Sequence, residues 1–184
     1  MINATLIDHM GTDLSVVNAA RVSFNKTSNW ELTDWRDSED YARKEVLSEA
    51  DTKLINYLAK HKHTSPFGHC FASFHIKAPV FVARQLVKHK FLRWNEISRR
   101  YVDDEPEFYQ PDEWRGRSAD KKQGSDGVVD VGKIGDISLA SKTLYNSLLD
   151  RGVAPEQARM VLPQSTMTEW YWSGSLDAFA DMCN

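Results

Sequence analysis

The sequence contains only two cysteines among its 184 residues, Cys70 and Cys183, and they lie far apart. Because neither belongs to a Cys-x-x-Cys pair, the sequence predicts neither a zinc ribbon nor a disulfide framework. Cys70 falls in an apolar stretch that we expect to be strand core, and Cys183 falls on an expected terminal helix. A nucleophilic cysteine needs a thiolate stabilised by nearby cations. Both cysteines are therefore poor candidates for a nucleophile.

Long apolar runs are also missing. No window approaches the ~18 uncharged apolar residues of a membrane-spanning helix, and the N-terminus has no basic segment followed by an apolar run. No internal repeat or low-complexity tract is present. We therefore expect a cytoplasmic protein with no membrane partner.

Length and composition are those of one folded domain. A chain of 184 residues buries roughly 70% of its unfolded surface, enough for a core of its own. Hydrophobic residues make up 41% and charged residues 27%, which are ordinary values for a folded globular protein. We expect a single domain over residues 1–184.

The apolar pattern predicts both helices and strands. The expected strands cover residues 4–7, 70–77 and 166–172, with a further short strand at the end of the segment 91–101. The expected helices cover residues 13–24, 41–60, 138–149 and 175–182, with others beginning at Pro79 and Pro155. Ser48 and Asp51 are possible breaks in the second of these helices.

Two segments lack an apolar period. Residues 25–39 are polar, with Trp30 and Trp35 set among charges, and they predict a surface excursion. Residues 112–136 contain five glycines and many charges. This composition predicts a long exposed loop.

The most unusual stretch is the basic segment, residues 84–101, which reads RQLVKHKFLRWNEISRRY. It carries six permanent cations and a single acid, although the whole chain has a net charge of −3. An anionic ligand would offset the repulsion among these cations, and phosphate is the first candidate. His89, Asn95, Glu96 and Ser98 can hydrogen-bond a planar heterocycle. The segment therefore favours a nucleotide ligand.

Two other interpretations of the basic segment stay open. Charge runs usually form a solvated helix face, but here the cations alternate with aromatic residues. Arginines and aromatic rings also form base-stacking platforms in proteins that bind single-stranded nucleic acids. The net charge and the lack of a second basic patch argue against nucleic acid as a partner.

Histidines before the basic segment and a serine within it suggest other chemistry. The histidines of residues 61–69 are of a type that often binds metals, but no clustered carboxylate or thiolate completes a site. We predict no metal and expect this loop to hydrogen-bond a cofactor. Ser98 would need an adjacent base to act as a nucleophile, so we expect its hydroxyl to donate to an anion.

The order Lys88-His89-Lys90, seven residues, then Ser98-Arg99-Arg100-Tyr101 resembles the signature of the flavin-dependent thymidylate synthases. The usual form in that family is Arg-His-Arg, seven residues, Ser. Further stretches resemble the family in the same order along the chain: RVSF from Arg21, residues 63–85, EFYQP at residues 107–111, and ARMVLP at residues 158–163. The resemblance covers nearly the whole chain, apart from residues 25–46 and the glycine-rich loop.

The resemblance implies an α+β fold with a small, mostly antiparallel sheet packed by helices. It also implies an enzyme that methylates dUMP to dTMP. The carbon donor would be methylenetetrahydrofolate, and the hydride source would be FAD reduced by NADPH. No protein cysteine attacks the pyrimidine in that chemistry. The family assembles as a homotetramer whose active sites are shared between subunits.

Site residues follow from the resemblance position by position. The residues implied for dUMP are Gln85, Lys88, Glu96, Ile97, Ser98, Arg99, Arg100 and Arg159. Those implied for FAD are Ser23, His63, Ser65, Lys88, His89, Lys90 and Glu96. Arginine forks suit phosphate, and a flavin carries out the redox step while the protein positions it.

Three departures from the family pattern matter. Lys88 and Lys90 keep the charge of the usual arginines but lose the planar fork, so we expect altered flavin or phosphate contacts. Asp177 and Asp181 stand where the family has an arginine and an asparagine, and these two contacts are not transferred. The arginine that polarises the uracil is expected two positions beyond Asn184, which predicts either a chain truncated at its C-terminus or an inactive nucleotide-binding relative.

Overall fold

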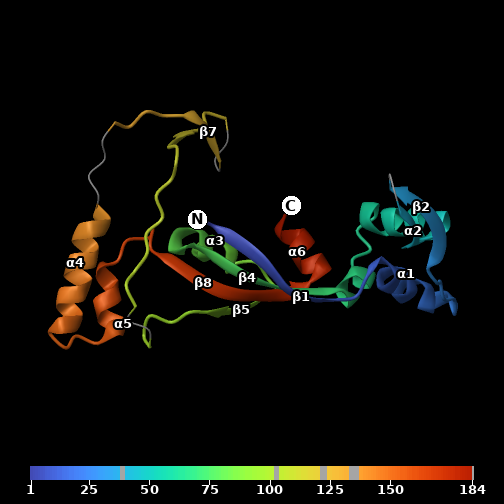
Figure 1. The fold of residues 1–184 in the computed structure, drawn as a ribbon, viewed down its shortest axis with the longest axis horizontal. Helices are drawn as coiled ribbons and strands as arrows, with labels where there is room; N and C mark the ends of the chain where they lie inside the picture. Colours follow the sequence, from blue (N-terminus) through green and yellow to red (C-terminus); the bar gives the residue numbers. More distant parts are fainter. Residues whose placement is uncertain (38–39, 102–103, 121–123, 133–136, 184) are drawn as a thin grey trace. The chain divides into compact units, whose positions relative to one another are not determined.

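The computed structural model describes residues 1–37, 40–101, 104–120, 124–132 and 137–183 (Figure 1). The strands are β1 (Asn3–Met10), β2 (Glu31–Asp37), β3 (Asp40–Val46), β4 (Phe71–Pro79), β5 (Arg93–Glu96), β6 (Arg115–Arg117), β7 (Ser125–Val128) and β8 (Met167–Ser175). The α-helices are α1 (Asp13–Arg21), α2 (Glu49–Lys60), α3 (Val80–Leu86), α4 (Ile137–Asp150), α5 (Pro155–Ala158) and α6 (Leu176–Met182). Short 3-10 helices are η1 (Val22–Phe24), η2 (Ser65–His69) and η3 (Arg159–Val161).

The fold is α+β, as predicted. Four strands form one sheet in the order β1-β4-β8-β5, and two further pairs, β2-β3 and β6-β7, form separate antiparallel hairpins. The chain divides into two compact units, and each of the four strands β1, β4, β5 and β8 contributes residues to both. The first unit comprises Met1–Asn3, Lys77–Leu86 and Glu96–Trp170; the second comprises Ala4–Ile76, Val87–Asn95 and Tyr171–Asn184. None of the described helices combines the length and apolar character that a membrane crossing requires.

In the first unit, the segment that leads into β8 is held from two sides. The N–H groups of Val80 and Phe81, at the start of α3, donate to the carbonyls of Thr166 (2.9 Å) and Gln164 (3.1 Å). Tyr109 N–H donates to Ser165 O at 2.7 Å. Helices α4 and α5 lie side by side in this unit (Figure 1). These backbone bonds fix the segment against α3 and thereby position the side chains that line the pocket described below.

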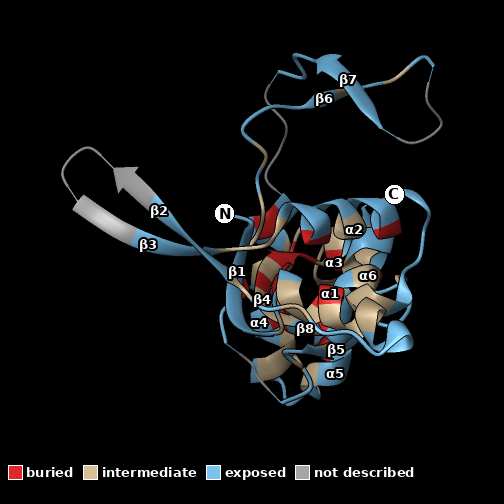
Figure 2. Ribbon diagram, turned by 90° about the vertical axis from the view of Figure 1, so that its right-hand side faces the viewer, coloured by how far each residue is buried: buried red, intermediate tan, exposed pale blue. Residues whose placement is uncertain are grey.

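In the second unit, α1 and α2 pack against each other and α1 and α6 pack against η2. Val16 and Val17 of α1 are fully buried, as their spacing predicted. Aromatic rings form a second cluster: Phe179 of α6 makes edge contacts with Phe74 and Trp172 at 5.3 Å, and Trp94 contacts Trp172 at 6.2 Å. Figure 2 shows that β1, by contrast, is exposed along its length.

One expected helix is partly wrong. Residues 40–46 form β3, which pairs with β2 in the register Glu31↔Val46, and the helix α2 begins only at Glu49. Ser48, considered above as a break, is the N-cap of α2, because its side chain accepts a bond from Asp51 N–H at 3.1 Å. The expected surface excursion at residues 25–39 therefore includes one strand of this hairpin. A hairpin held by backbone pairing needs no apolar period, which explains why the pattern misled.

The glycine-rich segment also contains structure that the sequence analysis missed. Within residues 112–136, β6 and β7 pair antiparallel with an irregular register beside Gly116. A Cβ atom at Gly116 would lie 2.5 Å from Asp126 O, so the close approach of the two strands requires glycine. The hairpin is mostly exposed (Figure 2).

The basic segment also differs from its prediction. Its first part lies on α3, as expected, but its strand β5 is at residues 93–96 and precedes the turn at residues 99–101. The expected order was a loop that ends in a strand. The position of the strand is explained by the pairing of β5 with β8, next to which Ile97 N–H donates to Glu169 O at 2.9 Å.

Candidate functional site

A pocket of about 720 Å³ lies in the first unit. Its walls come from α3, the end of β5 with the following turn, α5 and η3, and the start of β8. Six residues predicted for dUMP line it: Glu96, Ile97, Ser98, Arg99, Arg100 and Arg159. Gln85 lies on α3 but is not a lining residue, and Lys88 belongs to the second unit. The structure thus brings most of the predicted set into one cavity.

The pocket carries an excess of positive charge. Four arginines line it, Arg84, Arg99, Arg100 and Arg159, against two carboxylates, Glu96 and Glu156. Within the described ranges, none of these arginines forms an ion pair with a carboxylate inside 4.0 Å. Unpaired guanidinium groups in a cavity attract anions, and phosphate suits their planar donors. The electrostatics therefore favour a phosphorylated ligand.

The turn after β5 arranges its donors before any ligand arrives. The backbone N–H and Nε of Arg100 both donate to Ser98 Oγ, at 3.3 and 3.1 Å. Arg99 Nη1 donates to Asp104 O at 2.8 Å, and the Arg100 guanidinium lies 5.1 Å from the centre of the Tyr101 ring. Such preorganisation lowers the entropic cost of binding a ligand.

Ser98 is arranged as a donor. Its oxygen accepts both bonds from Arg100, which leaves the hydroxyl hydrogen available to a ligand. No imidazole or carboxylate of the described residues contacts this hydroxyl. An activated serine nucleophile requires such a base, so the geometry supports the expectation of a hydroxyl that donates to an anion.

Glu96 is fixed by a residue that the sequence analysis did not single out. Thr168 Oγ1, on β8, donates to Glu96 Oε1 at 2.7 Å, and Thr168 is buried. The neighbouring backbone bond from Ile97 to Glu169 holds β5 against β8 at the same level. The hydrogen bond from Thr168 fixes the orientation of the Glu96 carboxylate at the pocket wall.

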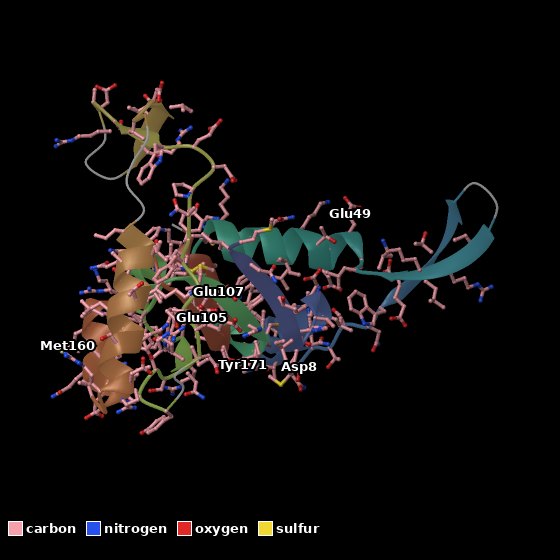
Figure 3. The ribbon with its side chains drawn as sticks, turned by 60° about the vertical axis from the view of Figure 1, so that its left-hand side comes forward. Asp8, Glu49, Glu105, Glu107, Met160 and Tyr171 are labelled. Carbon is pink, nitrogen blue, oxygen red and sulfur yellow. The ribbon has the colours of Figure 1, made fainter. Side chains whose placement is uncertain are left out.

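A second charged cluster lies beside the pocket, where Lys77 of β4 contacts two glutamates. Lys77 Nζ lies 2.7 Å from Glu107 and 3.5 Å from Glu169, and Glu107 is labelled in Figure 3. The hydrogen bond with Glu107 raises the pKa of Lys77, and the same bond lowers the pKa of Glu107. Both groups stay charged at neutral pH. The cluster connects β4 to β8 through Glu169 and to the segment between β5 and β6 through Glu107.

The residues predicted for FAD, apart from Glu96, all belong to the second unit. They are Ser23 of η1, His63 and Ser65 at η2, and Lys88, His89 and Lys90 in the turns after α3. The His63 ring stacks on Tyr57, with centroids 6.1 Å apart and planes at 16°. His89 is half-buried and the other five are exposed.

This donor set fits a flavin dinucleotide. Hydroxyls and ammonium groups at the surface are the chemistry that a pyrophosphate requires. A further acceptor lies beside them: Asp177 Oδ1 is buried without a hydrogen-bond partner in the described structure, and a Cβ atom added to Gly68 of η2 would lie 3.7 Å from it. A buried acceptor of this kind requires a donor, and a ligand hydroxyl or amine at η2 would supply one.

The sequence profile of the thymidylate synthase complementing protein family matches residues 5–184. The chain belongs to this family. It is 39% identical over 175 residues to a flavin-dependent thymidylate synthase of Thermus thermophilus, covering 93% of this chain and 58% of that one. It is 42% identical over 175 residues to the enzyme of the same name from Kosmotoga olearia, covering 91% and 69%. The chain thus spans less than two thirds of the Thermus relative.

A solved structure of similar fold supports the assignment. The UMP/dUMP methylase PolB from Streptomyces cacaoi, bound with 5-Br dUMP, matches with a TM-score of 0.74 and 31% identity. The match covers 97% of this chain and 75% of that one. The resemblance predicted from the sequence is therefore confirmed at the level of family and fold.

Several residues that line the arginine-rich pocket of this chain were not predicted, among them Arg84, Glu156, Gln164 and Thr168. Arg84 was counted among the cations of the basic segment, and its place on α3 four residues before Lys88 was a usable signal. Gln164 and Thr168 had no comparable signal. They enter the pocket because their segment hydrogen-bonds to α3 and β5.

The remaining candidates for chemistry are the cysteines and histidines. In the part of the chain that the structure describes, no group of three or more His, Cys, Asp or Glu side chains is placed to hold a metal. Both cysteines are free, Cys70 buried and Cys183 exposed. Burial, with a smaller effect of Asp13, raises the pKa of the Cys70 thiol, which disfavours the thiolate.

Proposed function

We propose that this protein methylates dUMP at carbon 5 to give dTMP in a flavin-dependent reaction. The observation that carries the proposal is the arginine-rich pocket of the first unit, in which Ser98 and the buried-threonine contact to Glu96 are already in place. Two similarities support it. The relatives from Thermus and Kosmotoga are named flavin-dependent thymidylate synthases, and the PolB structure holds a bromo-dUMP.

In this proposal the pocket residues divide between the two ends of the nucleotide. The phosphate binds to Arg99, Arg100 and Arg159 through charge-assisted bonds, with the Ser98 hydroxyl as a further donor. Glu96 and Ile97 face the nucleoside, together with Gln85 and Lys88 as the family pattern implies. Contacts at both ends of the nucleotide hold the base in one orientation.

The cofactor and co-substrates are part of the same proposal. Ser23, His63, Ser65, Lys88, His89, Lys90 and Glu96 would hold FAD. When bound, FAD supplies the hydride that it receives from NADPH, and methylenetetrahydrofolate supplies the carbon. No cysteine of the protein attacks the pyrimidine, in keeping with the raised pKa of Cys70.

We also propose a homotetramer with shared active sites. Apolar side chains are exposed on β1, at Leu6, Ile7 and Met10, and on α4, at Ile137 and Leu139. Exposed apolar surface of this kind is typical of protein interfaces. Light scattering on the purified protein tests the stoichiometry.

A product assay with omissions tests the function. The full-length protein, loaded with FAD, is incubated with dUMP, NADPH and methylenetetrahydrofolate, and dTMP is quantified by chromatography. Formation of dTMP that requires every component supports the proposal. Flavin binding without dTMP indicates an inactive nucleotide-binding relative. Oligonucleotide affinity that falls steeply with salt, in a protein that binds no FAD, indicates a single-stranded nucleic-acid-binding module.

Thr168→Val tests the contact that fixes Glu96. Loss of one charge-assisted hydrogen bond corresponds to about 1.5–3 kcal/mol at most, and a mobile carboxylate still reaches its ligand part of the time. We therefore expect the Kd for dUMP to rise about three- to tenfold, equivalent to about 0.7–1.4 kcal/mol, measured by calorimetry. Thr168→Ser keeps the hydroxyl and should bind dUMP like the unmodified protein. Equal affinity in the valine variant would contradict a positioning role for Thr168.

A further inference from the structure

A smaller pocket, of about 140 Å³, adjoins the arginine-rich pocket in the first unit. The two pockets have three lining residues in common, Ile97, Arg99 and Met167. The other residues that line the smaller pocket are all charged: Lys77, Asp104, Glu105, Glu107 and Glu169. We call it the acidic pocket. Arg99 thus lines both the pocket proposed for phosphate and a pocket that contains four carboxylates.

Arg99 forms no ion pair in the acidic pocket. None of the described carboxylates lies within 4.0 Å of its guanidinium group. Its Nη1 donates instead to the main-chain carbonyl of Asp104 at 2.8 Å. Contacts between arginine and a carboxylate are among the strongest hydrogen bonds in proteins, so an arginine beside four carboxylates is expected to pair with one of them.

The lysines explain why Arg99 stays unpaired. Lys77 Nζ lies 2.7 Å from Glu107 and 3.5 Å from Glu169, and Lys142 pairs with Glu105. Three of the four carboxylates therefore already have a lysine partner. Lys77 occupies two of them at once, and it is the lysine that lines the pocket.

Glu107 is the carboxylate that would compete for Arg99. The hydrogen bond from Lys77 is the largest cause of the lowered pKa of Glu107, and the charge of Arg99 makes a smaller contribution in the same direction. Glu107 therefore lies within electrostatic reach of Arg99. Lys77 balances one of the two negative charges of Glu107 and Glu169, and its removal would leave both unbalanced beside the guanidinium.

We propose that Lys77 is a positioning residue for the dUMP phosphate, because it occupies Glu107 and Glu169 and so leaves the Arg99 guanidinium to the nucleotide. This role rests on the proposed function, which assigns Arg99 to the phosphate. Lys77 does not line the arginine-rich pocket, so it acts through Arg99. Without Lys77, Arg99 pairs with Glu107, and a phosphate has to displace that carboxylate before it binds.

A double-mutant cycle with Arg99 tests this role, with the Kd for dUMP measured by calorimetry on the FAD-loaded protein. Lys77→Met should raise the Kd about two- to fivefold, the size of one exposed ion pair that must be broken. In the Arg99→Ala variant, the same substitution at Lys77 should cause no further rise, because the two residues act as one unit. Lys77→Arg keeps the charge and should bind dUMP like the unmodified protein.

Removal of the competing carboxylate should rescue the methionine variant. Lys77→Met/Glu107→Gln should recover most of the lost affinity, because Arg99 no longer meets Glu107. Lys77→Met/Glu113→Gln is the matched control, since it has the same formal charge but loses an exposed carboxylate that lines neither pocket. The control should keep the weakened affinity. Lys77→Gln, which retains a hydrogen-bond donor, takes the place of Lys77→Met if circular dichroism shows that the methionine variant is unfolded.

Three results would overturn the proposal. The first is an unchanged Kd in Lys77→Met. The second is an equal effect of Lys77→Met with and without Arg99, which would indicate a long-range charge effect or a distorted sheet. The third is the absence of any recovery when Glu107 is replaced by glutamine.

Inorganic phosphate as a second probe separates this role from the reaction. The same cycle measured with phosphate reports on the arginines without the nucleoside. The expected pattern in a protein that forms no dTMP in the omission assay would support the role of Lys77 and contradict the proposed function. Formation of dTMP with equal Kd values in all Lys77 variants would do the reverse, and a protein that binds neither phosphate nor dUMP would contradict both.

Discussion

Replacement of Arg159 by alanine is expected to weaken dUMP binding by about 1.5–3 kcal/mol, the usual size of a lost charge-assisted contact. Arg159 begins η3 directly after the fully buried Ala158, so its backbone is anchored while its side chain lines the pocket. No described carboxylate pairs with this guanidinium. Its interaction with a phosphate is therefore not offset by the loss of an internal ion pair.

Calorimetric titration of the FAD-loaded protein with dUMP measures this effect. The dissociation constant of Arg159→Ala should be higher by roughly ten- to a hundredfold. The dissociation constant of Arg159→Lys should lie between those of the unmodified protein and Arg159→Ala, because lysine keeps the charge without the planar fork. Arg151→Ala removes an exposed arginine after α4 that does not line the pocket, and it should leave dUMP affinity unchanged. Unchanged affinity in Arg159→Ala would exclude this residue from the dUMP site.

Replacement of Asp51 by alanine is expected to destabilise the protein by about 2–4 kcal/mol. Asp51 is 2% exposed and its carboxylate accepts bonds from Arg21, from Ser28 at 3.0 Å and from Ser48 at 2.9 Å. Breaking a buried ion pair costs about 3–5 kcal/mol because it leaves an unpaired charge. The figure is lower here because the Arg21 side chain is 24% exposed and can be hydrated.

Urea unfolding at pH 7, monitored by circular dichroism, tests this stability. Glu49→Ala is a matched control from the same first turn of α2, where Glu49 is exposed (Figure 3). Its bridge to Lys53 is solvated, so the control should change the free energy of unfolding by less than about 0.5 kcal/mol. Similar stability losses in the two variants would contradict the account of the buried network.

The same carboxylate predicts how stability depends on pH. Burial by itself raises the pKa of Asp51, but the hydrogen bonds from Arg21, Ser48 and Ser28 outweigh it and the pKa is lowered. The group therefore stabilises the fold fully above its unfolded pKa of about 3.9, and this contribution is lost as the pH falls through the lower folded pKa. Below about pH 4, the urea midpoint of the unmodified protein should fall more steeply than that of Asp51→Asn. Parallel curves would show that Asp51 does not titrate in this way.

The sequence predicted those parts of the fold in which burial imposes a period. The strand predicted at residues 70–77 alternates because Cys70, directly before β4, and Ile76 on β4 are both buried in the core. The α1 stripe at Val16 and Val17 is equally regular. Residues 31–46 could not be read in this way. Their hairpin is held by backbone pairing between polar strands, so no hydrophobic pattern marked it.

The candidate site likewise contains residues that the sequence predicted and residues that it did not. The family pattern located the residues from Glu96 to Arg100 and Arg159, because charge and spacing are visible in the chain. Thr168 was invisible, because it meets Glu96 across 72 positions only through the pairing of β5 with β8. The acidic pocket was missed for a similar reason, since it combines Lys77 of β4 with Glu107 and with Glu169 of β8.

Release of tritium from dUMP labelled at carbon 5 tests the central claim most directly, because methylation at that carbon must displace its hydrogen. With FAD, NADPH and methylenetetrahydrofolate, the full-length protein should release tritium into water, and omission of any one of them should prevent sustained release. Arg159→Ala should lower the rate at limiting dUMP by about the factor found for its dissociation constant. A protein that binds both FAD and dUMP but releases no tritium would contradict the proposed function.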